Sequence, residues 1–289
     1  MSTLAQDVPT EQENSRLRIG SRDKNVSWYN SNLETLTAAQ RDLFENYSHI
    51  PPDGVIPHIL RVREKAWQFH PLPCIGQLRF IDFALSQSPL YPEILARIKS
   101  GGKLLDLGCC FAQDLRKLAH DGAPVSLLYG AELESQYLEL GYELFLDRDT
   151  FKAKFIVADI LESQSPLQEL DGKMDIIYIG LFLHLFDLDG QRNICERIVK
   201  LLKNEKGVLV LGTQVGNTKP KDVPFGEAKK VFRHDEKSFE KLWKEVGEKT
   251  DTEWKVTASM DWGLGAGSKK RPWDDEDTRR LVFEVRRIR

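Results

Sequence analysis

Three carboxylates stand at regular intervals along the middle of this 289-residue chain, each at or near the end of a short apolar run. Asp106, Glu132 and Asp159 are separated by 26 and 27 residues, about the length of one strand and one helix. Because the carboxyl ends of parallel strands meet at one edge of a sheet, we expect these acids to lie side by side. A carboxylate accepts two hydroxyl hydrogen bonds at once, so this row suits a nucleoside-sized ligand.

Gly108 marks the turn that follows the first of these acids. The stretch KLLDLGCCFAQDLRKLA (103–119) joins an apolar run to leucines that recur at helical spacing. Glycine has no Cβ, so the backbone of such a turn can approach a ligand closely. The order is typical of a strand, a tight turn and a helix arranged around a ligand.

The elements that must position these groups alternate between strands and helices, which predicts a parallel sheet with helices on both faces. The apolar pattern predicts strands at 103–107, 125–131, 154–158, 174–179 and 206–212, and helices at 111–120, 134–146, 166–170 and 190–203. After Thr213, VGNTKPKDVPFGEA (215–228) is expected to be a long functional or mobile loop. A helix with an apolar face at Phe239 and Trp243 follows, and then an antiparallel hairpin of strands at 254–260 and 281–288.

The first 100 residues divide into two parts. Residues 1–26 are polar and lack a periodic apolar face, which predicts a disordered tail. Residues 27–100, the N-terminal segment, carry helical patterns. Thr37 and Gln40 have the spacing of a capping box and begin a helix that reaches Tyr47. Further helices are expected at 53–69, with Pro57 in its first turn, at 76–85 and at 91–99. We expect this segment to act as a lid or dimerisation surface for a cofactor-binding domain at 101–289.

Composition narrows the class of function. The net charge of −3 and pI near 6.1 argue against a general nucleic-acid binder and favour a small-molecule substrate. The four cysteines show no CxxC spacing, so no metal site is expected. The N-terminus lacks the apolar stretch of a signal peptide, and the longest apolar run, 174–186, is too short to cross a bilayer. These features predict a cytoplasmic protein that does not enter a membrane.

The series Asp106-x-Gly108, Glu132 and Asp159, followed by MDIIYIGLFLHLF (174–186), resembles the class I S-adenosylmethionine-dependent methyltransferases. The resemblance implies that the first motif holds the methionine end of the cofactor. It implies that Glu132 takes both ribose hydroxyls and that Asp159 contacts the adenine amino group. Further cofactor contacts are implied for Cys109, Asp114, Leu133, Ile160 and Leu181.

The first motif of that family usually reads D-x-G-x-G-x-G, whereas this chain has Cys110 and Ala112 at the second and third glycine positions. Both residues are small, so we expect the loop to be kept. The resemblance also implies a Rossmann-like α/β fold. Its sheet would have seven mostly parallel strands, with an antiparallel last strand and extra N-terminal helices.

Four further stretches resemble a fungal family of secondary-metabolite methyltransferases that includes enzymes making methyl esters of polyketide-terpenoid hybrids. They are HPLPCIG, FLHLFD, VLVLGTQVG and FRHDEKSFEKLWKEVGEKTDTEWKV. The resemblance runs from about Trp28 to the C-terminus. It implies O-methyl transfer to a small, largely apolar acid or phenol, and a homodimer that involves the N-terminal helices.

The need for a catalytic base depends on the acceptor. A carboxylic acid is already ionised at neutral pH, whereas a phenol would be helped by a histidine. His184, just after the fourth predicted strand, is the first candidate, and His234 is the second, with Arg233 beside it to pair with a carboxylate. A histidine satisfied within the fold and a solvated charge pair are the ordinary alternatives. In the N-terminal segment, Trp67, Gln77 and Arg79 are predicted to contact the acceptor, although most apolar residues there are expected simply to pack.

Two other functions are compatible with part of this pattern. A nicotinamide-dependent oxidoreductase also places an acid after the second strand, but the chain lacks G-x-G-x-x-G, and Asp159 would have no role. A scaffold protein without activity would be expected to lose the cofactor acids, and all three are present. Methyl transfer is therefore the favoured hypothesis.

Overall fold

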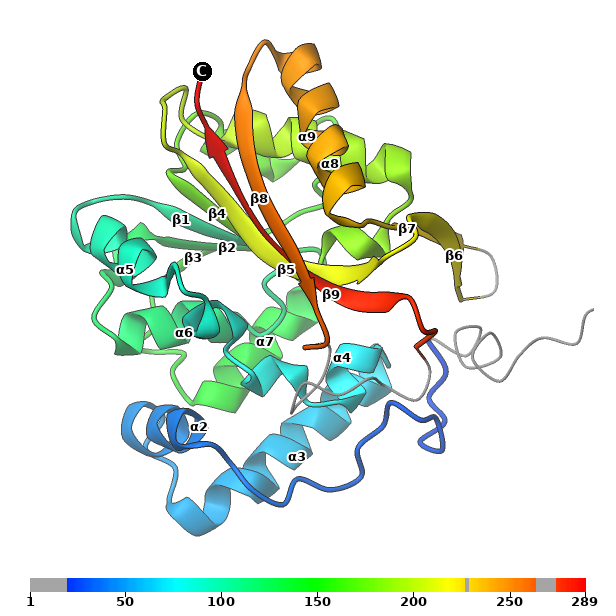
Figure 1. Cartoon of the computed structure of the whole chain (residues 1–289). Coiled ribbons are helices and arrows are strands. Elements are labelled where there is room, and N and C mark those ends of the chain that lie inside the picture. Colours follow the sequence, from blue (N-terminus) through cyan, green and yellow to red (C-terminus); the bar gives the residue numbers. More distant parts are fainter. Residues whose placement is uncertain (1–19, 227–228, 264–273) are drawn as a thin grey trace, which may run out of the picture.

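The computed structural model describes residues 20–226, 229–263 and 274–289, and a seven-stranded sheet runs through it (Figure 1). The strand order is β3-β2-β1-β4-β5-β9-β8. The first five strands pair in parallel, and β9 runs antiparallel to both of its neighbours. The expected fold class is confirmed. The strands of this sheet are β1 (Leu104–Leu107), β2 (Leu128–Glu132), β3 (Lys154–Val157), β4 (Ile176–Gly180), β5 (Leu209–Asn217), β8 (Trp254–Asp261) and β9 (Thr278–Arg287).

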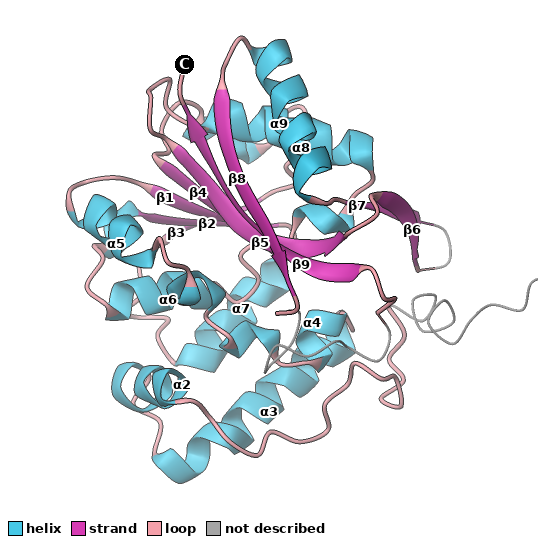
Figure 2. Ribbon diagram, in the orientation of Figure 1, coloured by secondary structure: helices cyan, strands magenta, loops and turns pink. Residues whose placement is uncertain are grey.

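Helices cover both faces of the sheet, as Figure 2 shows. Apolar side chains from one face pack with α8 and α9, and those from the other face pack with α5, α6 and part of α7. This burial follows from the continuous apolar runs of the strands, which suit a sheet covered on both sides. These helices are α5 (Tyr91–Lys99), α6 (Gln113–His120), α7 (Ser135–Phe145), α8 (Leu188–Leu201) and α9 (Glu236–Thr250).

The N-terminal segment forms a third layer, which packs through α3 (Pro52–Phe69) on α7 (Figure 1). The predicted capping box begins α2 (Ala38–Asp42): Thr37 Oγ1 accepts from the amide of Gln40, and Gln40 Oε1 accepts from the amide of Thr37. A π-helical turn (Leu43–Tyr47) continues α2 to the expected end. The predicted helix at 53–69 is confirmed as α3, with Pro57 inside it.

The helix predicted at 76–85 is wrong. The chain instead forms the short α4 (Pro73–Gly76) and two 3-10 turns, Arg79–Ile81 and Ala84–Gln87. Leu78 and Phe83 take φ values of 60° and 48°, and residues in this left-handed region interrupt a right-handed helix. The apolar side chains of this stretch are still buried. The turns therefore bury the same side chains that the predicted helix would have buried.

The loop predicted at 215–228 is also wrong. Strand β5 continues to Asn217, and the chain then forms a separate antiparallel pair, β6 (Lys221–Phe225) and β7 (Lys229–Arg233). Val223 and Val231 face each other and are buried. Pro224 is tolerated because a two-stranded pair has open edges where a missing amide donor costs little.

Smaller differences concern element boundaries. The predicted strand at 125–131 begins as a 3-10 turn (Val125–Leu127), and the predicted helix at 166–170 is a 3-10 helix (Pro166–Leu170). The predicted hairpin is confirmed by the antiparallel pairing of β8 with β9. Residues 1–19 of the predicted tail and 264–273 of the predicted hairpin loop lie outside the described residues. Among the helices that the structure describes, none is long and apolar enough to cross a membrane.

Candidate active site

The three predicted acids lie at the carboxyl ends of the adjacent strands β1, β2 and β3. Asp106 lies in β1, where its register partners are Gly130 on β2 and Tyr178 on β4. Glu132 is the last residue of β2, and Asp159 follows β3 by two residues. The parallel register therefore brings the acids to one edge of the sheet, where open α/β folds bind ligands.

The turn after β1 keeps the backbone that a glycine-rich loop would have. Cys110 and Ala112, at the two positions where glycine was expected, have φ values of 52° and 51°, and Gly108 has 75°. The amide of Cys110 donates to Glu132 Oε2 at 2.8 Å, which ties the turn to the end of β2. A Cβ added to Gly108 would lie 2.5 Å from Phe182 Cδ2, so only glycine fits there. The loop is thus preserved despite both replacements.

A hollow of about 50 Å³ opens beside Asp106; we call it the strand-end hollow. Asp106 is 2% exposed, and its Oδ2 has no hydrogen-bond partner among the described residues. Burial, together with the nearby carboxylates of Asp114 and Glu132, raises the pKa of Asp106 well above its usual range. A cation bound in the hollow would favour the ionised forms of these acids, and the α-ammonium of an amino acid is such a cation. The hollow is lined by Arg79, Asp82, Ala84, Asp106, Gly108, Gln113, Asp114, Tyr178, Gly180, Leu181 and Thr213.

Asp114 gives the hollow a pH dependence that can be measured. Burial raises the pKa of Asp114 to about 6, although a hydrogen bond from the amide of Leu85 acts in the opposite direction. A carboxylate must lose its proton to pair with an ammonium group. Through Asp114, affinity for S-adenosylhomocysteine should therefore fall by up to about tenfold per pH unit below about pH 6, while Asp106, whose pKa is also raised, adds a dependence at higher pH. Titration calorimetry at several pH values checks this, and Asp114→Asn should make the dependence below about pH 6 less steep.

The other two acids border an apolar surface. Glu132 Oε1 accepts from the amides of Leu133 and Glu134, and Asp159 Oδ1 accepts from the amide of Leu161. The side chains of Leu133 and Leu161 are 57% and 43% exposed. Carboxylates beside exposed leucines suit a ribose and a flat base. Ile160 is buried beneath this surface, with 5% exposed.

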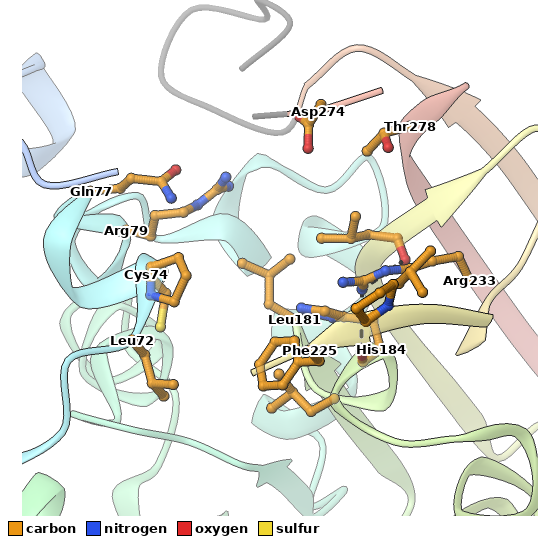
Figure 3. A pocket seen from close by; sticks show the side chains of 15 residues that line it. Leu72, Cys74, Gln77, Arg79, Leu181, His184, Phe225, Arg233, Asp274 and Thr278 are labelled. Atoms are coloured by element: carbon orange, nitrogen blue, oxygen red, sulfur yellow. Dashed lines mark hydrogen bonds between the residues drawn. The ribbon is translucent and has the colours of Figure 1, made fainter. Parts of the chain in front are cut away.

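A second opening of about 110 Å³ lies next to the strand-end hollow; we call it the apolar cavity (Figure 3). One wall comes from the N-terminal segment at 72–79, and the opposite wall comes from the turn after β4 and from the pair β6–β7. Arg79 and Leu181 line both openings, so the two meet at these residues. The lining consists of Leu72, Pro73, Cys74, Gln77, Arg79, Leu181, His184, Leu185, Val215, Val223, Pro224, Phe225, Arg233, Asp274 and Thr278.

Two guanidinium groups enter this mainly apolar wall from opposite sides. Arg233, on β7, donates from Nη1 to the carbonyls of His184 and Val215 at 3.2 and 3.5 Å. Arg79 forms an ion pair with Asp82 at 3.2 Å. Figure 3 shows Arg79 and Arg233 on facing walls, with His184 beside Arg233. The structure brings Gln77, Arg79, His184 and Arg233 together in the lining of this cavity, while their predicted roles toward the acceptor stay predictions.

Trp67 and His234 lie elsewhere, and their predicted contacts with the reacting groups are corrected. Trp67 is fully buried among the N-terminal helices, where its Nε1 donates to the carbonyl of Arg22. His234 is 1% exposed, its Nδ1 lies 2.8 Å from Ser238 Oγ, and its ring packs on Phe239. Burial lowers the pKa of His234 to about 4. Neither side chain lines the cavity or the hollow, so both have structural roles.

The comparisons with known proteins decide among the alternatives that the sequence left open. A family described as the meroterpenoid methyltransferase N-terminal domain matches residues 28–81. The O-methyltransferase atr3 of Stereocaulon alpinum is 47% identical over 272 residues, which cover 92% of this chain and 77% of that protein. The chain belongs to this family of fungal methyltransferases. Neither an oxidoreductase nor an inactive scaffold agrees with this membership.

Other members of the methyltransferase family match over similar lengths. The O-methyltransferase phiE of a fungal species is 37% identical and covers 93% of this chain and 98% of its own. The asnovolin E/chermesin D methyltransferase nvfJ of Aspergillus novofumigatus is 40% identical, with 81% and 87% covered. A solved S-adenosylmethionine-dependent methyltransferase from Mesorhizobium loti aligns with 70% of this chain and all of its own, at 15% identity and a TM-score of 0.46.

The residues present fit S-adenosylmethionine, the methyl donor that the sequence resemblance implies. The buried acids of the strand-end hollow suit its ammonium group, and Glu132 with the exposed leucines suits its nucleoside. Cys109 is buried under the turn and supports it. Within the described part of the chain, no group of three or more histidine, cysteine, aspartate or glutamate residues could hold a metal ion.

Sequence reasoning missed several residues of the site. Phe225 and Val223 lie on the β6–β7 pair, within the stretch expected to be a loop. Its unusual length was the available signal that it had a function. Thr278 comes from the start of β9, far along the chain. Tyr178 lines the hollow from β4, where the apolar run gave no hint of a polar role.

Proposed function

We propose that this methyltransferase forms the methyl ester of a small, largely apolar carboxylic acid of fungal secondary metabolism. The observation that carries the proposal is the pair Arg79 and Arg233 in the wall of a mainly apolar cavity that meets the strand-end hollow and has a single acid, Asp274, in its described lining. A guanidinium group binds a carboxylate with charge-assisted hydrogen bonds, whereas a neutral phenol gains little from it. The names of the relatives support O-methylation.

In this proposal the residues of the chain bind and align rather than exchange protons. The cofactor, when bound, supplies a methyl group already activated by a sulfonium. Leu181 lies where the hollow and the cavity meet, so the acceptor oxygen would point past it. Arg233 orients the carboxylate, and Phe225 with the neighbouring apolar residues excludes water. Alignment and exclusion of water supply the rate enhancement that such a transfer needs.

A substitution at His184 distinguishes a carboxylic acid from a phenol as the methyl acceptor. It is 8% exposed, lines the cavity and holds Arg233 through its backbone carbonyl. If the acceptor is a carboxylate, His184→Gln should change kcat less than about threefold and should leave the pH dependence of kcat the same as in the wild type, since no base is needed. The test measures transfer of a labelled methyl group to a panel of benzoic acids and matched phenols. A large loss confined to phenols, with no transfer to acids, would replace esterification with phenol methylation.

We also propose that the enzyme is a homodimer joined through its N-terminal helices and that it works in the cytoplasm. The resemblance to the family supports the first point, and the four free cysteines fit a reducing compartment. Light scattering on the purified protein measures its mass in solution, and a monomer at micromolar concentration would contradict the dimer. Imaging of a tagged protein in its host tests the location.

A further inference from the structure

Three openings meet at Arg79. Besides the strand-end hollow and the apolar cavity, a groove of about 580 Å³ runs between the N-terminal segment and the sheet edge; we call it the polar groove. It shares Gln77 and Arg79 with the cavity, and it shares four residues with the hollow: Arg79, Asp82, Ala84 and Thr213. The site of methyl transfer therefore opens into the polar groove as well as into the apolar cavity. A largely apolar acceptor does not account for this groove.

The polar groove differs from the apolar cavity in chemistry. Amide and hydroxyl side chains make up much of its wall, including Asn32, Thr35, Thr37, Gln40, Ser86 and Gln87. Several of these side chains can still donate or accept a hydrogen bond beyond those they form within the protein. Thr37 Oγ1 accepts from the amide of Gln40, which leaves its hydroxyl hydrogen to donate. Ser86 Oγ donates to the carbonyl of Phe83, which leaves its lone pairs to accept. A wall with both donors and acceptors suits a ligand rich in hydroxyl groups.

Gln77 stands where the groove joins the cavity and points to a ligand. Its Nε2 is buried and has no hydrogen-bond partner within the described ranges. A buried amide donor without a partner costs free energy, so its persistence at a junction of two openings indicates an acceptor atom that arrives with a ligand. Such an atom would lie within reach of both openings.

The cofactor does not explain the groove. Its nucleoside belongs with Glu132 and Asp159, at the ends of β2 and β3. The groove reaches the sheet at Thr213 on β5 and Arg280 on β9, on the opposite side of β1. Gln77, whose amide donor has no partner among the described residues, lines the groove and the apolar cavity but not the strand-end hollow. A ligand that Gln77 binds in the groove is therefore connected to the acceptor rather than to the cofactor.

We propose that the polar groove is a second acceptor subsite, which binds a hydroxyl-rich arm attached next to the carboxyl group of the acid. The arm must leave close to the carboxyl group because the groove opens beside Gln77 and Arg79, while the hydrocarbon part fills the apolar cavity. This inference rests on the proposed function, because it takes the acceptor to be a carboxylic acid.

Four benzoic acids test the subsite by titration calorimetry on the full chain saturated with S-adenosylhomocysteine. They are salicylic acid, 2-hexyloxybenzoic acid, 2-(β-D-glucosyloxy)benzoic acid and its 4-glucosyloxy isomer. We expect the 2-glucoside to bind about tenfold more tightly than salicylic acid, as one or two added hydrogen bonds would give. The 4-glucoside and the hexyl ether should show no such gain, because the first points its sugar away from the groove and the second offers no polar partner.

Two variants test whether Gln77 causes the higher affinity for the 2-glucoside. Gln77→Met removes the amide donor at nearly constant size. On this variant the 2-glucoside should bind less than about threefold more tightly than salicylic acid, so the ratio of the two affinities is the readout. Val223 lines the cavity but not the groove. Val223→Ala should therefore lower the affinity for every acid that binds by a similar factor. Equal affinity for the 2-glucoside and salicylic acid would overturn the subsite and leave esterification intact. Failure of all four acids to bind would reject the carboxylic acceptor and the subsite together.

Discussion

The Asp106→Asn variant is expected to bind S-adenosylhomocysteine on the order of 100-fold more weakly than the wild type and to unfold at a higher temperature. Loss of one partner of a buried charge pair costs about 3 kcal/mol, which corresponds to this change in Kd. Burial holds the pKa of Asp106 above its unfolded value, so ionisation at rising pH removes stability between the two pKa values. The amide avoids that loss at neutral pH. Calorimetry measures both quantities.

The opposite edge of the sheet offers a matched control. Asp175 accepts from the amide of Lys103 and from Lys203 Nζ, both at 2.8 Å, and is remote from the hollow. Asp175→Asn should lower the unfolding temperature and leave the Kd unchanged. Glu132→Ala should also weaken binding, because that carboxylate holds the amide of Cys110 and is predicted to bind the ribose hydroxyls. Unchanged affinity in both Asp106→Asn and Glu132→Ala would show that the cofactor site is assigned wrongly.

The sheet and its row of acids could be predicted because their signals are local and repeat. Each strand is a short apolar run, and each acid follows such a run at a nearly constant interval. Parallel register then fixes where Asp106, Glu132 and Asp159 meet, without knowledge of any distant contact. The capping box is equally local, since both of its hydrogen bonds join Thr37 and Gln40, within four consecutive residues.

The residues that were misplaced depend on contacts that the sequence does not show. Trp67 was expected at the substrate, but the helix that carries it turns this face toward Tyr29 and Arg22. Arg233 is the last residue of β7, and His234 follows it directly. Arg233 lines the cavity, whereas His234 is buried with 1% exposed. One position in the chain therefore separates the two roles.

The β6–β7 pair shows why glycine and proline content alone misleads. Such residues indicate turns, yet Val223 and Val231 supply an apolar face that closes over the cavity. A two-stranded pair is marginal by itself and persists because this face is buried against the rest of the site. Only the assembled fold provides that burial, so the sequence could show the length of the segment but not its structure.

Arg233→Gln is expected to raise the KM for benzoic acids about 30-fold, with kcat changed only a few-fold. A hydrogen bond to a charged group contributes about 2 kcal/mol, and it holds the acid before and during transfer alike. Arg233→Lys should recover part of the loss, because it keeps the charge but not the planar fork. Steady-state rates of methyl transfer at several acid concentrations measure these values.

A substitution at a nearby lysine serves as the control that distinguishes a specific role of Arg233 from a general loss of positive charge. Lys230 is exposed on the same strand, so Lys230→Gln removes one positive charge without altering the cavity. Its KM should match that of the wild type. Arg233 also donates to two backbone carbonyls, so the unfolding temperature of each variant must be followed. A KM that rises equally for acids and for neutral phenols would mean that Arg233 supports the shape of the cavity, and the carboxylate acceptor would lose its main argument.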